Sequence, residues 1–311
     1  MTVVADPFAH LALFYQDADD YVAGTVPFIQ AGLESGEPVA VAVPGAQLEL
    51  LRSELGLAAA RVHLVDMQVA GRNPGRIIAQ VLRAFADAHE DAERVRIIGE
   101  PIWPGRTELE YPACAQHEAL INMAFAGRSV TILCPYDSSA LDERVLADAE
   151  TTHPLIIDRG KQRDAQDFDP ERIVRDYNRP LPEPVTDEFE IMAFDHDNLL
   201  DTRRFAVETA ERLGMGSVRV GELEVAVGEL TANSLAHGGG SGTLRAWAEH
   251  GHVCLEVSDA GHLADPLAGR IPAGLRDDGG RGLLLAQHLS DLLRVFTTPA
   301  GTTIRAYFAL G

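Results

Sequence analysis

The sequence has very little lysine: Lys161 is the only one among 311 residues. A P-loop nucleotide site needs a Gly-rich turn followed by Lys and then Ser or Thr, but Gln162 follows this lysine. The same scarcity argues against Schiff-base enzymes, Ser-x-x-Lys acyl enzymes and the strand lysine of protein kinases. None of these four chemistries is expected.

Cysteine is also scarce, and Cys114, Cys134 and Cys254 lie far apart without a Cys-x-x-Cys pair. An odd number at such spacing does not support a disulfide framework or a zinc ribbon. His10 and His117 have no partner at metal-ligand spacing either. The sequence therefore does not indicate a metal site in the N-terminal half.

Long apolar runs and a positively charged N-terminal segment are missing as well. No run reaches the roughly 18 apolar residues of a membrane helix, and no signal-peptide pattern opens the chain. We therefore expect a cytoplasmic protein that does not enter a membrane.

Basic residues are outnumbered, with 26 Lys and Arg against 47 Asp and Glu, for a formal net charge of −21. Such a surface repels nucleic-acid phosphates and anionic lipids, so neither is an expected partner, and a basic protein surface suits better. With 46% hydrophobic residues the chain can build real cores. Its length favours two domains, because domains usually span about 100–200 residues.

A composition shift divides the chain. Between Asp158 and Glu190, charged residues and four prolines replace the apolar periodicity, and only a short helix over 171–177 is expected there. We predict an N-terminal domain over residues 1–158, a Pro-rich charged linker over 159–186 and a C-terminal domain over 187–311.

In the N-terminal part, short apolar runs alternate with amphipathic stretches. Strands are predicted at His10–Tyr15, Pro38–Val43, Arg61–Val65, Val95–Ile98 and Val130–Leu133, and helices at Asp19–Leu33, Gln47–Leu55, Pro74–His89 and Ala113–Phe125. Five such alternations predict an α/β domain with a mostly parallel sheet.

The order of predicted elements differs in the C-terminal part. Strands are predicted at Glu188–Phe194, Thr243–Glu249, Val253–Ser258, Leu293–Thr297 and Thr303–Phe308, and helices at Leu199–Leu213, Val218–His237 and Gly282–Leu292. We expect an α+β domain whose helices cover one face of a mixed sheet.

Three polar residues share one face of the second of these helices. Glu229, Asn233 and His237 are spaced four residues apart, so neighbouring members lie about 6 Å apart along the axis. A carboxylate beside a neutral oxygen ligand suits a site that holds Mg²⁺ on nucleotide phosphates and orients a hydroxyl for attack. A polar helix face is the alternative interpretation of the row taken alone.

Three further motifs follow the row in a fixed order. Ser258-Asp259-Ala260-Gly261 ends a strand, Gly279-Gly280-Arg281-Gly282 opens a helix, and Gly301-Thr302-Thr303 enters the last strand. With the Glu-x-x-x-Asn-x-x-x-His row, this order resembles the Bergerat-fold (GHKL) ATPases, and the short lid between Gly261 and Gly279 most resembles the anti-sigma factor serine kinases. The resemblance implies a two-layer α/β sandwich from about Val185 to the C-terminus.

The resemblance also implies roles for these residues, with ATP and Mg²⁺ as ligands. Glu229 would be the general base and Asn233 the Mg²⁺ ligand, with His237 and Arg281 beside the nucleotide. Asp259 would accept the adenine amino group, Gly261 would let the backbone approach the base, and Thr302 would support it. Gly280 and Gly282 would present backbone N–H groups to the phosphates.

One position departs from the family pattern Asp-x-Gly-x-Gly. Leu263, after His262, stands where the pattern has its second glycine. We expect its side chain to narrow the nucleotide pocket or to change how the lid folds.

The N-terminal part carries a second resemblance. The runs that carry it are His10-Leu11-Ala12-Leu13-Phe14-Tyr15, Gly36-Glu37-Pro38, Gly99-Glu100-Pro101-Ile102-Trp103 and Cys134-Pro135-Tyr136-Asp137. Over about residues 8 to 155 these runs resemble the MEDS sensory domain, a family thought to sense simple hydrocarbon derivatives.

Ligands of parallel α/β domains bind at the carboxyl ends of the strands. The predicted sensor pocket for a small apolar ligand therefore contains Tyr15, Glu100, Trp103, Cys134 and Tyr136. Alternatively, these residues bind no ligand and only pack the fold: Cys134 is a small core residue and Trp103 fills a loop.

Together these observations predict a cytoplasmic two-domain regulator: a small-molecule sensor joined to an ATP-dependent serine kinase of the anti-sigma type. Its expected partners are a sigma factor, an anti-sigma antagonist protein, or both. The alternatives are a non-catalytic module that sequesters a partner and a sensor histidine kinase. For the latter, the residues after His117-Glu118 lack the expected basic residue and proline. The oligomeric state stays open, a homodimer being one alternative.

Overall fold

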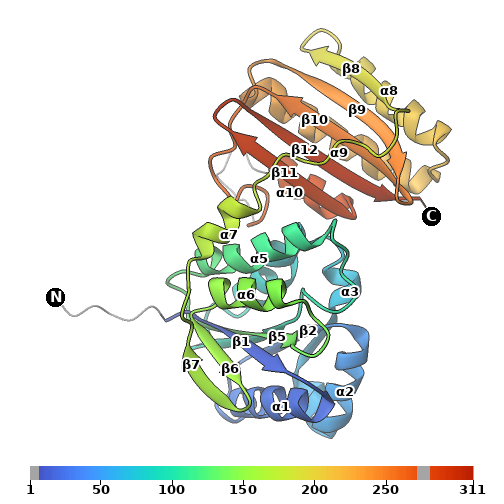
Figure 1. Ribbon diagram of the computed structural model, residues 1–311. Helices are drawn as coiled ribbons and strands as arrows, with labels where there is room; N and C mark the ends of the chain where they lie inside the picture. The colour runs from blue at the N-terminus through green and yellow to red at the C-terminus, as the bar shows by residue number, and fades with distance from the viewer. Residues whose placement is uncertain (1–6, 272–280, 311) are drawn as a thin grey trace. The chain divides into compact units, whose positions relative to one another are not determined.

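The computed structural model describes residues 7–271 and 281–310, and the chain divides into two compact units, Met1–Tyr177 and Asn178–Gly311 (Figure 1). Among the helices of the described residues, none combines the length and the apolar character that crossing a bilayer requires.

The N-terminal unit is built on a seven-stranded sheet of order β3-β2-β4-β5-β1-β6-β7. The strands are β1 (Ala9–Tyr15), β2 (Val39–Val43), β3 (His63–Asp66), β4 (Val95–Gly99), β5 (Val130–Asp137), β6 (Leu155–Asp158) and β7 (Lys161–Asp164). All pairs are parallel except β6 with β7. The expected mostly parallel α/β sheet is confirmed.

Helices lie on both faces of this sheet (Figure 1). α1 (Ala18–Glu34) and α2 (Gly45–Leu55) cover one face, and α5 (Tyr111–Ala124), α6 (Glu143–Thr152) and α7 (Pro170–Asp176) the other. The remaining helical segments are η1 (Gly56–Arg61), α3 (Met67–Ala70), η2 (Pro74–Arg76), η3 (Ile78–Arg83) and α4 (Ala84–Asp87). The single helix predicted at Pro74–His89 is thus three consecutive segments, with a π-helical stretch in the middle.

The register of β1 and β5 decides which side chains face which layer. Leu11, Leu13 and Tyr15 of β1 pack into the core against α1. Because side chains alternate along a strand, His10, Ala12 and Phe14 point to the opposite face. Cys134 and Tyr136 pair with Ala12 and Phe14, so they share that second face.

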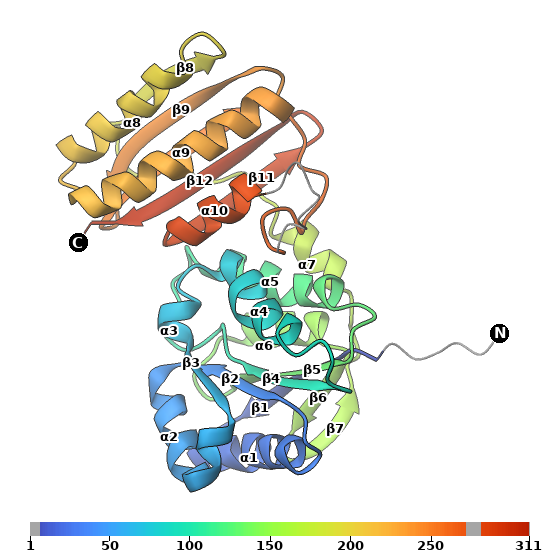
Figure 2. The same cartoon turned by 180° about the vertical axis from the view of Figure 1, so that it is seen from behind.

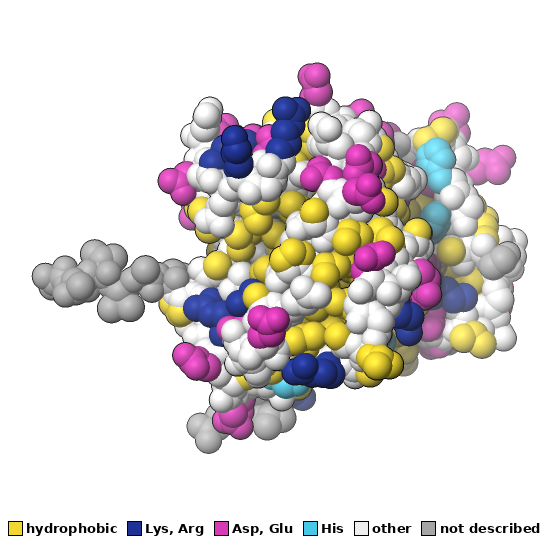
Figure 3. All heavy atoms as spheres, turned by 90° about the horizontal axis from the view of Figure 1, so that it is seen from below, with side chains coloured by type: hydrophobic (Ala, Val, Ile, Leu, Met, Phe, Trp, Pro, Cys, Tyr) yellow, Lys and Arg dark blue, Asp and Glu magenta, His cyan; other side chains and the backbone are white. Residues whose placement is uncertain are grey.

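The outer side of α1 is partly apolar. Val22, Ala23, Val26 and Pro27 are half-buried or exposed, and apolar side chains gather on the face of the N-terminal unit that Figure 3 shows. Since apolar atoms make up a large share of any folded protein's surface, this face needs no special role.

The C-terminal unit has a five-stranded sheet of order β11-β12-β10-β9-β8. Its strands are β8 (Glu190–Asp195), β9 (Ser241–Glu249), β10 (His252–Asp259), β11 (Leu292–Thr298) and β12 (Gly301–Ala309). Every pair is antiparallel, so the expectation of a mixed sheet was wrong. Short hairpin turns join β9 to β10 and β11 to β12, and such turns can join only antiparallel strands; the pairs β8–β9 and β10–β12 have longer connections.

Three helices cover one face of this sheet (Figure 2): α8 (Leu199–Arg212), α9 (Ser217–His237) and α10 (Arg281–Leu289). The core between the layers contains Leu223, Val227 and Leu230 of α9 against Leu244, Leu255 and Ala306 of the strands. The two-layer α+β fold predicted for this part is confirmed.

The other face of the sheet is covered by the extended residues 178–189, part of the predicted linker. The Pro182 carbonyl accepts a 2.8 Å hydrogen bond from Nη2 of Arg305, and Glu183 forms a 3.2 Å ion pair with Arg245. Val185 N donates to Glu249 at 3.1 Å. This segment is therefore a packed part of the C-terminal unit. The short helix expected over 171–177 is present as α7.

Candidate functional site

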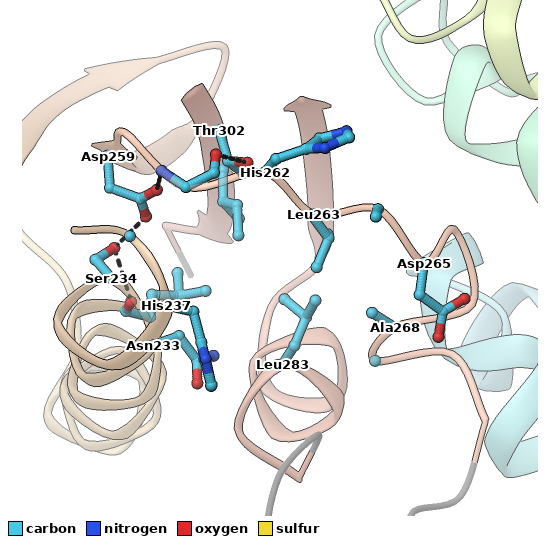
Figure 4. A pocket seen from close by; sticks show the side chains of 16 residues that line it. Asn233, Ser234, His237, Asp259, His262, Leu263, Asp265, Ala268, Leu283 and Thr302 are labelled. Atoms are coloured by element: carbon cyan, nitrogen blue, oxygen red, sulfur yellow. Dashed lines mark hydrogen bonds between the residues drawn. The ribbon is translucent and has the colours of Figure 1, made fainter. Parts of the chain in front are cut away.

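A cavity of about 380 Å³ lies at one end of the C-terminal unit, between α9, α10 and the adjoining ends of β10 and β12 (Figure 4). It is lined by Leu230, Asn233, Ser234, His237, Gly238, Asp259, Gly261, His262, Leu263, Ala264, Asp265, Ala268, Gly269, Leu283, Thr302 and Ile304. Pockets for small ligands usually measure about 300–1,000 Å³. The cavity is large enough for a nucleotide base and sugar.

The predicted polar row lies on the last turns of α9. Asn233 and His237 line the cavity, one helical turn apart, and His237 is exposed. Glu229 lies one turn earlier, half-buried, and its carboxylate is directed at the start of α10. A methyl group added at Gly282 would approach Glu229 Oε2 to 2.5 Å. The row therefore runs from the cavity to the N-terminus of α10.

Asp259 is held rigidly at the opposite wall. The Ser234 hydroxyl donates a 2.6 Å hydrogen bond to Oδ2, and the Gly261 backbone N–H donates a 2.8 Å hydrogen bond to Oδ1. A carboxylate offers about four lone-pair sites, so both oxygens can still accept a bond from a ligand. The arrangement fixes a negatively charged acceptor at the cavity wall.

Thr302 lies beside Asp259, its register partner on β12. Its hydroxyl donates a 2.8 Å hydrogen bond to the Gly261 carbonyl, so the Thr297 hydroxyl, 2.7 Å away, acts as the donor to Thr302. Thr297 in turn accepts the Leu263 backbone N–H at 3.0 Å. This chain of hydrogen bonds fixes the backbone on both sides of His262.

Two predicted glycines leave room that a side chain would fill. A Cβ atom at Gly261 would come within 2.6 Å of the His237 carbonyl, and one at Gly282 would reach Glu229. Gly280 lies outside the described residues. Arg281 is the first residue of α10 and is exposed.

Leu263 contributes a side chain to the cavity where the family pattern has glycine. It points toward Leu283 of α10 (Figure 4), and both residues belong to the core packing of this unit. Leu230 and Ile304 continue the apolar lining. The cavity thus has one polar wall around Asp259 and one apolar wall.

None of the sequence motifs predicts a role for Ser234 or Thr297, which orient Asp259 and Thr302. The one available signal is that Ser234 directly follows Asn233, so it lies on the adjoining helix face that contacts β10. For Thr297 no local signal exists, because its partner comes from the next strand.

In the N-terminal unit, two of the predicted sensor residues lie together. The hydroxyls of Tyr15 and Tyr21 donate hydrogen bonds of 3.1 and 3.3 Å to Oε1 and Oε2 of Glu100, which is completely buried. Burial raises the pKa of Glu100 to about 8, although both hydrogen bonds favour the ionised form.

The other three predicted sensor residues lie elsewhere, so the five do not share one crevice. Cys134 and Tyr136 are on the opposite face of the sheet from Tyr15, because the register of β1 and β5 sends them there. Trp103 lines a separate cavity of about 180 Å³.

The Trp103 cavity is more polar than expected. The Arg106 guanidinium lies 3.9 Å from the Trp103 ring centroid, and Arg144 lies 4.7 Å from that of Tyr111. Glu108 and Asp142 also line it. It can therefore accept a small ligand with a polar group next to an aromatic ring.

Comparison with known families gives two separate matches. Residues 9–154 match the MEDS family, described as the methanogen/methylotroph, DcmR sensory domain. Residues 192–308 match the histidine kinase-like ATPase domain family. The predicted resemblances to the MEDS sensory domain and to the ATPases of the histidine kinase-like superfamily are therefore confirmed. No curated protein matches the chain.

Three solved structures are similar to parts of the chain. The RsbU and RsbW domains of a Mycobacterium tuberculosis protein are 18% identical over 40% of this chain and 32% of theirs, with a TM-score of 0.31. The SiaB–SiaC complex of Pseudomonas aeruginosa is 14% identical over 38% of this chain and 88% of its own, with a TM-score of 0.31. The histidine kinase AdeS of Acinetobacter baumannii is 12% identical over 66% and 98%, with a TM-score of 0.24. The chain spans about a third of the first of these, and at such TM-scores the likenesses carry no functional conclusion.

Proposed function

We propose that the protein is a sensor-controlled protein serine kinase of the anti-sigma type, because residues 9–154 match the MEDS sensory domain family and residues 192–308 match the histidine kinase-like ATPase domain family. The ATPase domain would bind Mg-ATP and phosphorylate a partner protein. The MEDS domain would set that activity in response to a small molecule.

The observation that carries the ATP proposal is the anchored carboxylate of Asp259 opposite the apolar wall of the cavity. Adenine presents an amino donor at one edge and a flat apolar face, and this pair of walls matches both. Asp259 would accept from the amino group, and Leu263 and Leu283 would contact the ring. The backbone of Gly261 leaves the room that the base needs.

The residues on α9 and α10 suit the binding of the phosphate groups of ATP. Asn233 offers an amide oxygen to Mg²⁺, which prefers oxygen ligands. The start of α10 presents backbone N–H groups and the positive end of a helix dipole to the phosphates. When bound, Mg²⁺ would neutralise charge on the phosphate oxygens.

Glu229 would act on the attacking hydroxyl. In this step a partner serine oxygen bonds to the γ-phosphorus, the bond from that phosphorus to the β,γ-bridging oxygen breaks, and ADP leaves with the bond's electron pair. The serine proton passes to the Glu229 carboxylate, and Asn233 keeps the metal and phosphate in place.

The partner we propose is a sigma factor, an anti-sigma antagonist protein, or both. The formal net charge of −21 favours a partner with a basic contact surface, because complementary charge speeds and orients association. In the sensor domain, the cavity at Trp103 is the proposed ligand site. Control needs only a differential free energy of about 1–3 kcal/mol between two states of the protein.

The segment before the ATPase domain disfavours the histidine kinase alternative. Residues 178–189 are extended and bound to the sheet through Arg305 and Arg245. A dimerisation helix pair carrying a phospho-accepting histidine would have to stand in this place.

Incubation with γ-labelled ATP, with and without candidate partners, tests the proposal. We expect label on the partner chain in an acid-stable bond, as in phosphoserine. Acid-labile label on the protein itself would identify a histidine kinase instead. Partner binding without any transfer would identify a sequestering module.

A further inference from the structure

Four side chains that bind metals meet in the interior of the N-terminal unit. His10 lies on β1, Glu118 on α5, Cys134 on β5, and His153 directly follows α6. All four are at least 99% buried. Their potential ligand atoms lie within 4.8 Å of one another.

Three of the separations between potential ligand atoms in this cluster are short. His10 Nε2 lies 3.4 Å and His153 Nε2 lies 3.3 Å from Oε2 of Glu118. Cys134 Sγ lies 3.4 Å from His10 Nε2. What these contacts mean depends on where the two imidazoles carry their protons.

The tautomer of His153 follows from its other ring nitrogen. Nδ1 lies 2.8 Å from the carbonyl oxygen of Ala149, which can only accept a hydrogen bond. Nδ1 therefore carries the proton. In the neutral ring, Nε2 is then bare and directs its lone pair at Glu118.

The tautomer of His10 follows from the orientation of Asn122. Nδ2 of Asn122 donates to the carbonyls of Thr152 at 2.8 Å and Ala119 at 3.1 Å, which fixes its amide group. Oδ1 is then the atom 3.2 Å from His10 Nδ1, and that nitrogen must be the donor. His10 Nε2 is also bare in the neutral ring.

With both rings neutral, two imidazole nitrogens and a carboxylate therefore converge as acceptors, and the Cys134 S–H is a donor beside them. Both oxygens of Glu118 and Nε2 of His153 have no hydrogen-bond partner in the described part of the chain. The hydroxyl of Tyr136, buried nearby, donates to none of them. Unpaired buried acceptors at this density are costly unless a cation binds them.

We propose that His10, Glu118, Cys134 and His153 form a zinc site of the MEDS domain. In a tetrahedral zinc site with bonds of about 2.0–2.3 Å, neighbouring ligand atoms are about 3.3–3.7 Å apart. The three approaches above, at 3.3–3.4 Å, have this separation. The remaining pairs, within 4.8 Å, need to shorten by at most about 1.5 Å.

The surroundings support the same assignment. Metal-bound histidines donate their second N–H to a carbonyl or amide oxygen, as both rings do here through Ala149 and Asn122. One thiolate, two imidazoles and one carboxylate suit Zn²⁺ rather than Ca²⁺ or Mg²⁺, which prefer oxygen alone. Four protein ligands close the site, so the ion would link β1, β5, α5 and the end of α6 rather than activate water.

Elemental analysis of the full chain, purified without a histidine tag, tests the site. We expect about one zinc per chain. After removal of zinc with a chelator, titration with Co²⁺ should produce a sulfur-to-cobalt charge-transfer band and tetrahedral ligand-field bands that saturate at about one equivalent.

Variants assign the cobalt signals to the cluster. Cys254→Ala, which alters a buried thiol of the C-terminal unit, should keep both signals. Cys134→Ser should lose the charge-transfer band, and His153→Gln should lower the Co²⁺ affinity at least tenfold. Wild-type protein with only trace metal and no Co²⁺ absorption would overturn the proposal, as would a band that disappears in Cys254→Ala. These outcomes are independent of ATP binding.

Discussion

The Ser234 hydroxyl holds the Asp259 carboxylate through a 2.6 Å hydrogen bond that joins α9 to the end of β10. Because the Gly261 N–H binds the other oxygen, the carboxylate has one orientation, with its plane fixed at the cavity wall. The position of the proposed adenine acceptor therefore depends on a helix that also carries Asn233 and Glu229.

Ser234→Ala should consequently weaken ATP binding, because Asp259 loses the hydrogen bond that orients its carboxylate. A net hydrogen bond is worth about 0.5–1.5 kcal/mol, so we expect a loss of roughly 2- to 10-fold in affinity. Isothermal titration calorimetry measures it, with the exposed Ser241→Ala as the control. Equal affinities in both variants would show that Ser234 does not position Asp259.

Glu229→Gln should separate catalysis from binding. The substitution keeps the size of the side chain beside Gly282 but removes its basicity. Phosphoryl transfer to the partner should fall by roughly 10²- to 10⁴-fold while ATP affinity stays close to wild type. Parallel losses of transfer and of affinity would mean that Glu229 has a structural role.

Glu100 should make the stability of the protein depend on pH. Its pKa is about 8 in the folded state against 4.5 for an ordinary glutamate, so between these two pH values the folded state holds a proton that the unfolded chain has lost. The protonated carboxyl makes its full contribution to the free energy of unfolding below the lower pKa, 4.5. This contribution is lost as the pH rises through the upper pKa, about 8.

The free energy of unfolding from urea titrations should therefore fall between about pH 5 and pH 8, by an amount on the order of a few kcal/mol. Glu100→Gln should flatten this dependence, because its amide does not titrate; its oxygen still accepts from one tyrosine hydroxyl, and its NH2 group can donate to the oxygen of the other. An identical slope in the wild type and in the variant would contradict the assignment.

Trp103 should report on the proposed sensor cavity. In a Trp247→Phe background it is the single tryptophan, and its ring lies against Arg106. Small halogenated or alcohol-like compounds should change its fluorescence in a saturable way, with modest affinity because so few atoms make contact. Arg52→Ala, at an exposed position on α2, serves as the control variant and should show the same fluorescence response. A response to ATP alone, with none to any small organic compound, would contradict a sensor site there.

Most elements could be predicted because apolar periodicity is a local signal. The run Val39–Val43 is buried throughout, as a central parallel strand should be. Segments without that signal were missed: β7 is Lys-Gln-Arg-Asp, an edge strand that is largely exposed. Strand direction is likewise absent from local sequence, so the C-terminal sheet was expected to be mixed.

The candidate sites, like the secondary-structure elements, could be predicted only where their signal is local in sequence. The row on α9 was predictable because four-residue spacing is a property of one helix. The cluster around Glu118 was not, since His10 and Cys134 are 124 residues apart and meet only through the pairing of β1 with β5. The five predicted sensor residues come from neighbouring strand ends, but the register of β1 and β5, which local sequence does not encode, places Cys134 and Tyr136 on the opposite face from Tyr15.

The central claim is that the cavity between α9, α10 and β10 binds Mg-ATP, and a calorimetric titration of the full chain with ATP and Mg²⁺ tests it most directly. We expect saturable binding of about one ATP per chain, weakened at least tenfold by Asp259→Asn, which replaces one acceptor oxygen with a donor, and also by Asn233→Ala. The exposed Ser241→Ala should bind as the wild type does. No saturable binding at millimolar ATP, or binding that both site variants leave unchanged, would contradict the account.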